Sequence, residues 1–181
     1  IDIKPFEQKI NHSQPILSIG SCFADNIAKR LQHSKFQTVA SPTGILFNPE
    51  SIALTIERFA QATKSEEALP TKNLLQFSNG LWFSYDFHSS FSHIDADTAL
   101  NQMRTAVKAG ADALSRAGVV IITFGTAFAY RLNESGEVVA NCHKQPQSIF
   151  TRQMLSVDSI IQRYTKLLQG AHSDKRVIFT L

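Results

Sequence analysis

The chain has 181 residues, which suits a single domain, and its 43% of hydrophobic residues supplies a full core and excludes a disordered chain. A net charge of +3 without a run of Lys and Arg argues against nucleic acid as a partner. The longest apolar runs are far too short to cross a bilayer, so no membrane span is expected.

The first third of the chain predicts two strands, each followed by a helix. The apolar run Pro15 to Ile19 predicts a strand, and the helical spacing of the next apolar residues predicts a helix over residues 23–33. Residues 36–40 indicate a second strand. Asn48-Pro49-Glu50 then opens a second helix, with proline in the first turn, where its missing N–H does no harm.

The polar stretch over residues 61–73 has no clear pattern. Two β-like runs follow it, Leu74 to Phe77 and Leu81 to Tyr85. They flank Asn79-Gly80, a pair that is typical of a two-residue hairpin turn.

Residues 87–94 indicate a loop that holds two His and three Ser. Asp95 or Asp97 is expected to cap a helix that runs to about Ala117. Val119 to Phe124 is the clearest buried strand of the chain.

The last part of the chain predicts a second hairpin with its tip at residues 134–137, followed by a polar segment over 141–146. A helix that begins at Ser156 or Asp158 and a terminal strand over 176–181 complete the pattern. Helices that alternate with short apolar strands predict an α/β fold with a mostly parallel sheet, on which the two β-hairpins are insertions.

The carboxyl ends of these strands are the expected place for a site, because ligands bind there in open α/β sheets. The ends deliver Gly20-Ser21-Cys22, residues 41–44, Gly125-Thr126 and whatever follows Leu181. The first three carry small residues, hydroxyls or a thiol, which suits a site where backbone N–H groups must approach a substrate closely.

Cys22 and Ser21 are the candidate nucleophiles. Cys22 lies where a strand turns into a helix, and the free N–H groups and partial positive charge of a helix N-terminus favour a thiolate over a thiol. Ser21 is the alternative nucleophile if a base lies beside it. The competing interpretation is structural, with Ser21 capping the helix and Cys22 filling the core, and spacing alone favours it.

Polar residues elsewhere carry less specific signals. His143 is a candidate general base, and His88 with His93 is a candidate for substrate binding, although spacing alone favours an ordinary polar surface for each. Asn48 fits a helix cap. No dinucleotide-binding or phosphate-binding glycine motif is present, and no ligand spacing suits a metal, so we expect no cofactor and no metal.

The two cysteines, Cys22 and Cys142, form no Cys-x-x-Cys pair, and their low number fits a reducing compartment such as the cytoplasm. The chain begins at Ile1 without a methionine and stops in an apparent strand. We therefore expect residues 1–181 to be one domain, truncated at its C-terminus, of a longer protein. The oligomeric state does not follow from the sequence.

Gly20-Ser21-Cys22-Phe23-Ala24 is the motif for which the GSCFA family is named, and the chain resembles that family over nearly its whole length. Further blocks occur in the family's order. They are Pro42-Thr43-Gly44-Ile45 with Asn48-Pro49, Asp86-Phe87-His88-Ser89, Thr123-Phe124-Gly125-Thr126-Ala127, and Asn141-Cys142-His143-Lys144 with Pro146. Five ordered blocks are specific, whereas one five-residue match would be weak.

The resemblance implies an SGNH-like hydrolase fold, which is a three-layer α/β/α sandwich. Members of that wider superfamily are esterases and acyl hydrolases that act on lipids, acetylated sugars and similar esters. A small-molecule ester or an acylated glycan is therefore the implied partner.

The superfamily's sequence blocks also imply roles for particular residues. Against its Gly-Asp-Ser block, Cys22 falls on the nucleophile and Ser21 on the preceding Asp, which leaves open which of the two attacks. Gly44 matches the glycine whose N–H serves the oxyanion hole. The third block, Gly-x-Asn-Asp, is Gly125-Thr126-Ala127-Phe128 here and lacks the Asn. Its substitutes would be Thr126, Asn48 or Asn141.

The superfamily's catalytic Asp/His pair follows the final strand, after Leu181, so we expect the fragment to be inactive on its own, with His143 as the best base within it. The leading prediction is an ester or acyl hydrolase. One rival is a module that binds a glycan or acyl group without turnover. Another is an acyltransferase that passes the acyl group to a sugar hydroxyl.

Overall fold

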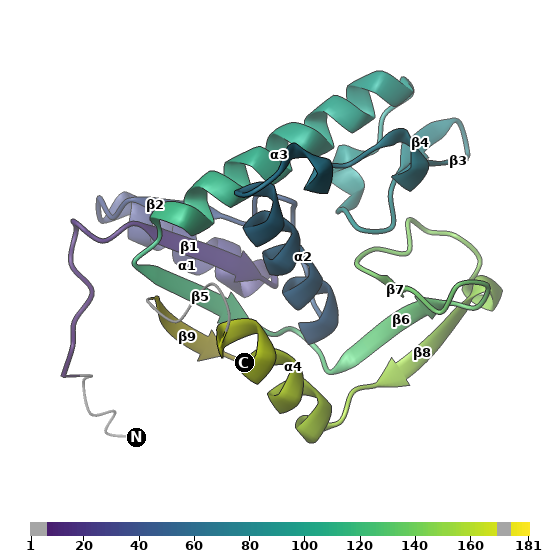
Figure 1. The fold of residues 1–181 in the computed structure, drawn as a ribbon. Helices are drawn as coiled ribbons and strands as arrows, with labels where there is room; N and C mark the ends of the chain where they lie inside the picture. The colour runs from purple at the N-terminus through teal and green to yellow at the C-terminus, as the bar shows by residue number, and fades with distance from the viewer. Residues whose placement is uncertain (1–6, 170–174) are drawn as a thin grey trace.

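The computed structural model describes residues 7–169 and 175–181, and its centre is a parallel sheet of four strands in the order β2-β1-β5-β9 (Figure 1). The strands are β1 Ile16–Gly20, β2 Thr38–Ala40, β5 Val119–Thr123 and β9 Arg176–Thr180. Every residue of β1 and β5 is buried, which is usual for the central strands of a parallel sheet. The predicted α/β class with a parallel sheet is confirmed.

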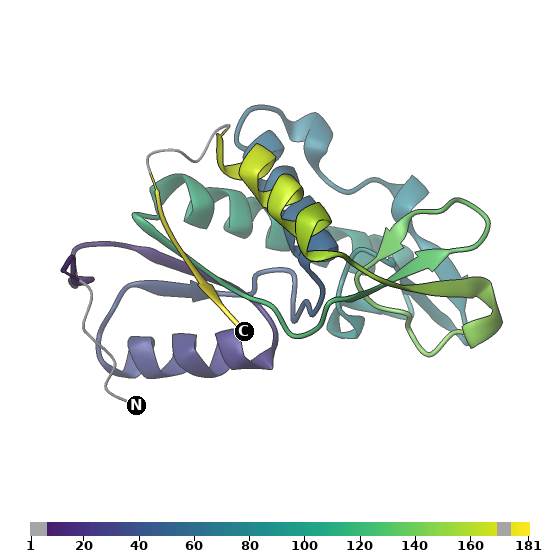
Figure 2. The same ribbon diagram turned by 90° about the horizontal axis from the view of Figure 1, so that it is seen from below.

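Helices lie on both faces of this sheet (Figure 2). They are α1 Cys22–His33, α2 Pro49–Ala62, α3 Ala96–Arg116 and α4 Val157–Gln169. α1 lies on one face, over a small core that includes Ile16 and Ile121, and the other three helices lie on the opposite face. Because successive side chains of a strand point to opposite faces, Leu17 and Ile19 enter the larger core under α2 and α3.

Side chains cap the starts of three helices. Asn48 accepts a hydrogen bond from the first turn of α2 at 2.8 Å, Asp95 does the same for α3 at 2.7 Å, and Ser156 for α4 at 3.1 Å. In each case where two caps were possible from the sequence, the residue nearer the N-terminus is the one used.

β3 (Gln76–Ser78) and β4 (Leu81–Phe83) form the first predicted hairpin. Asn79 and Gly80 between them have φ angles of 52° and 77°, the two positive values that a type I′ turn requires. The patternless stretch before this hairpin contains two 3-10 turns, η1 (Glu66–Ala68) and η2 (Lys72–Leu74).

A separate antiparallel sheet has the order β7-β6-β8. β6 (Phe128–Leu132) and β7 (Val138–Val139) form the second predicted hairpin, but β8 (Phe150–Met154) was not expected from the sequence. Four of the five β8 residues are exposed, so no alternation of apolar residues marks this strand. Backbone pairing with β6 forms the strand, helped by the Arg152 guanidinium, which lies 3.6 Å from the centre of the Phe128 ring.

Candidate active site

The turn between β1 and α1 depends on Gly20. Its φ of 138° is rare for residues with a side chain, and a Cβ at this position would lie 2.1 Å from the carbonyl oxygen of Thr123. The next residue, Ser21, donates its N–H to that same carbonyl at 3.1 Å. The chain therefore leaves β1 in close contact with the end of β5 and enters α1 at once.

This geometry exposes a thiol at the first position of α1. Cys22 is exposed and free, whereas Ser21 is only 5% exposed and takes the N-cap position without a side-chain capping bond. Within the described residues, the N–H groups of Cys22 and Phe23 donate no hydrogen bond. Cys22 therefore does not fill the core, as the structural alternative expected, whereas Ser21 does occupy the N-cap position.

The loop between β2 and α2 crosses the end of β1. Leu46 donates its N–H to the carbonyl of Gly20 at 2.9 Å, which fixes the loop against the turn. Gly44 has a φ of 86°, and its N–H donates to Ser41 within the loop at 2.8 Å. A Cβ on Gly44 would lie 2.3 Å from the Cβ of His88, so the η3 loop (Ser89–Phe91 with its N-cap His88) packs directly on it.

The segment after β5 completes the surroundings of the turn. Gly125 and Thr126 both donate their N–H groups to the carbonyl of Phe47, at 2.8 and 3.1 Å. A Cβ on Gly125 would come within 3.0 Å of the Cβ of Ser21 and 2.9 Å of the Phe47 ring. Phe47 is 45% exposed, so an accessible aromatic ring lies beside the turn.

These contacts change which groups are available to an oxyanion. The N–H groups of Gly44, Gly125 and Thr126 are already used, and the side chain of Asn48 is occupied with Ser51, as cap and as donor to its hydroxyl at 2.9 Å. The Cys22 and Phe23 N–H groups are the ones that remain free next to the thiol in the described structure.

His143 lies in a different group of contacts. Its Nε2 is 2.8 Å from the carbonyl oxygen of Ser84 and 3.1 Å from that of Phe87, and its Nδ1 is 3.4 Å from Ser92 Oγ. The ring stacks on Phe83, with 4.4 Å between the ring centres. Burial lowers the pKa of His143 below its usual value and so favours the neutral ring. It forms no hydrogen bond with the turn in the part of the chain that the structure describes.

Asn141 and His88 belong to the same region. Asn141 Oδ1 accepts the N–H of His143 at 2.8 Å, and His88 Nδ1 accepts the N–H of Ser90 at 3.2 Å. The predicted site residues thus form two groups, one around Ser21 and Cys22 and one around His143, connected by the packing of His88 on Gly44.

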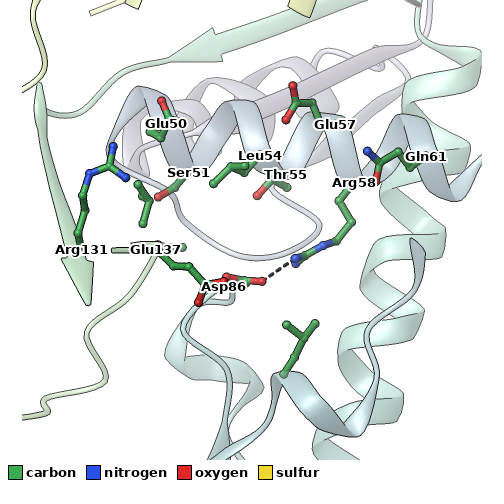
Figure 3. Close-up of a pocket in the computed structure, with 13 residues that line it drawn as sticks. Glu50, Ser51, Leu54, Thr55, Glu57, Arg58, Gln61, Asp86, Arg131 and Glu137 are labelled. Atoms are coloured by element: carbon green, nitrogen blue, oxygen red, sulfur yellow. Dashed lines mark hydrogen bonds and ion pairs between the residues drawn. The ribbon is translucent and has the colours of Figure 1, made fainter. Parts of the chain in front are cut away.

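A polar pocket of about 470 Å3 lies between α2 and the segments around Asp86 and β7 (Figure 3). Arg58 of α2 pairs with Asp86 across it at 2.5 Å. Arg163 of α4 donates two hydrogen bonds to Glu57, at 2.5 and 2.6 Å, and these lower the pKa of the Glu57 carboxyl. These two ion pairs connect α2 to its neighbours. Because the charged groups are already paired with one another, we assign this pocket no chemistry.

A sequence model of the GSCFA family matches residues 15–181. The chain belongs to the GSCFA family. No curated protein and no solved structure matches it.

The GSCFA blocks that the sequence contains are neighbours in the fold. The GSCFA motif itself forms the β1–α1 turn, and the blocks around Gly44 and Gly125 are bonded or packed against it. The block that contains His88 packs on Gly44, and the block that contains His143 bonds to the loop just before His88. Two further residues of this region, Phe47 and Ser92, had no specific signal, although Ser92 lies in the His- and Ser-rich loop.

Two structural observations concern metals and membranes. Among residues 7–169 and 175–181, no group of three His, Cys, Asp or Glu side chains is placed to hold a metal ion. None of the described helices is both long and apolar enough to cross a membrane.

Proposed function

We propose that this GSCFA chain is an ester or acyl hydrolase in which Cys22 attacks the carbonyl carbon of the substrate. The observation that carries the proposal is an exposed thiol at the first position of α1, next to two free backbone N–H groups. The positive end of the helix favours a negatively charged oxygen of the substrate. The helices on both faces of the sheet agree with the three-layer SGNH-like arrangement that the resemblance implies.

In the proposed reaction, the Cys22 sulfur forms a thioester and the alcohol leaves with a proton. The Cys22 and Phe23 N–H groups hold the oxyanion, and water then releases the acid. Ser21 is the weaker nucleophile candidate because its side chain is nearly buried beside Gly125. The resemblance implies a histidine after β9 as the general base, since His143 is occupied elsewhere. An acylated glycan or another small ester remains the proposed substrate.

The test is hydrolysis of p-nitrophenyl acetate by the full-length protein and three variants. In a Ser92→Ala background, which removes the serine that lies beside His143, Cys22→Ala is expected to lower kcat/KM by about 1,000-fold or more, because removing a nucleophile closes the covalent route. Ser21→Ala should retain most of the activity, and Cys142→Ala is the matched control for loss of a thiol. Equal turnover by all four proteins would end the proposal.

A binding module without turnover is the second candidate. It is favoured by the absence of an Asn in the Gly125-Thr126-Ala127-Phe128 block and by the occupied N–H groups of Gly44 and Gly125. Ligand binding that survives Cys22→Ala, in a full-length protein that hydrolyses no ester, would support it.

The thiols of Cys22 and Cys142 should differ in their rate of alkylation, and one experiment can measure both rates. Iodoacetamide is expected to alkylate Cys22 at least about tenfold faster than Cys142, because the reactive species is the thiolate. Cys22 is exposed, whereas Cys142 is partly buried and burial raises the pKa of its thiol. Mass spectrometry of the two peptides over time measures both rates, with each cysteine as the reference for the other. Equal rates would contradict the environment described for Cys22.

A further inference from the structure

The tautomer of His143 is determined by its surroundings. Nε2 lies within hydrogen-bonding distance of two backbone carbonyl oxygens, those of Ser84 at 2.8 Å and Phe87 at 3.1 Å. Carbonyl oxygens only accept hydrogen bonds, so Nε2 carries the proton. In the neutral ring, Nδ1 then carries a free lone pair.

That lone pair faces a serine hydroxyl. Ser92 Oγ lies 3.4 Å from Nδ1, and this is the single hydrogen bond of the Ser92 hydroxyl within the described residues. The two backbone carbonyls accept from Nε2, the ring nitrogen that does not face Ser92, and so orient the imidazole as a carboxylate does in a Ser-His-Asp triad. The arrangement is that of a nucleophile, a base and a group that orients the base, with a long bond between nucleophile and base.

The surrounding structure holds this pair in place. The imidazole stacks on the buried ring of Phe83, and Asn141 accepts the backbone N–H of His143. His143 and Lys144 have φ angles of 49° and 56°, which cost energy in residues with side chains and are concentrated at functional sites.

Ser92, His143 and Asn141 line one cavity of about 440 Å3. The Asn141 side-chain nitrogen has no hydrogen-bond partner in the described part of the chain and is a free donor at the cavity wall. Leu81 and Phe83 supply apolar surface, and Lys144 a positive charge. The cavity therefore combines a nucleophile, a base, an amide donor and room for a small acyl group.

We propose that Ser92, activated by His143, is the nucleophile of a second acyl-transfer site that takes small carboxylic esters and does not use Cys22. Ser92 Oγ attacks the ester carbonyl carbon and its proton passes to His143 Nδ1. The C–O bond of the ester breaks, and the leaving alkoxide takes that proton as the alcohol. Water then attacks the acyl-serine with His143 as base, which releases the carboxylic acid and restores Ser92.

The test uses an alkyl fluorophosphonate, with the modified serine located by peptide mass spectrometry. In this reaction the serine oxygen binds phosphorus and fluoride leaves, so the adduct marks an activated hydroxyl. We expect the adduct on the half-buried Ser92 and not on Ser90, which is exposed in the same loop, lies 3.0 Å from His88 Nδ1 and does not line the cavity, so that it serves as the internal control.

Three variants of the full-length protein separate this site from the turn. Cys22→Ala and Ser90→Ala should leave labelling of Ser92 unchanged, and His143→Gln should slow it by about 100-fold, a usual contribution of a general base. Circular dichroism checks that His143→Gln is folded. The wild-type experiment can decide alone: an adduct on Ser90 as well as Ser92, or no adduct on Ser92, overturns the proposal. Labelling of Ser92, together with a loss of the remaining ester hydrolysis when Cys22→Ala is added to Ser92→Ala, would support both sites.

Discussion

Gly20→Ala is expected to lower the free energy of unfolding by about 3 kcal/mol or more, because backbone strain and overpacking each contribute about 1–3 kcal/mol. The φ of 138° is strained for alanine, and the new Cβ would lie 2.1 Å from the carbonyl oxygen of Thr123. That oxygen belongs to the backbone of the neighbouring strand and has no flexible side chain to move. Urea unfolding followed by circular dichroism measures the loss.

Gly136→Ala is the matched control for Gly20→Ala. Gly136 also has a positive φ, 72°, but a Cβ added there, at the hairpin tip, would meet nothing within 4 Å. Only the backbone strain remains, and the expected loss is about 1 kcal/mol. If the two variants lose the same stability, the close approach of β1 to β5 is not the reason that glycine is needed.

Gly110→Ala is expected to destabilise the protein by about 1–3 kcal/mol, although alanine is normally favoured over glycine in a helix. Gly110 is buried in α3, and a Cβ there would lie 2.3 Å from two ring carbons of Phe59. Phe59 belongs to α2 and is fully buried, so its ring has little room to shift. Gly118→Ala is the control, since its nearest neighbour would be at an ordinary 3.6 Å.

A double mutant tests whether contact with the Phe59 ring is the cause of the destabilisation expected for Gly110→Ala. Phe59→Leu removes ring atoms and should cost stability in the wild type, but it should cost less, or nothing, in the Gly110→Ala background. The expected coupling is about 1 kcal/mol or more, as for residues in direct contact. Urea unfolding of the four proteins measures it, and additive losses would show that the ring is not what the added methyl meets.

Local chemistry was sufficient to predict most elements of the fold. The caps at Asn48 and Asp95, the Asn79-Gly80 turn and the buried run over β5 depend on short-range geometry, which is visible in a few consecutive residues. β8 could not be predicted in this way, because its residues are mostly exposed and its partner β6 lies about twenty residues before it.

For the candidate site, the residues of the β1–α1 turn and membership of the GSCFA family were visible in the amino-acid sequence. The sequence could not show that Cys22 is exposed, that Gly44 and Gly125 have used their N–H groups, or that His143 faces Ser92 rather than the turn. Hydrogen bonds and exposure of this kind join segments that are far apart in the chain. Their partners are chosen by the packing of loops at the end of the sheet, and no short run of residues encodes that packing.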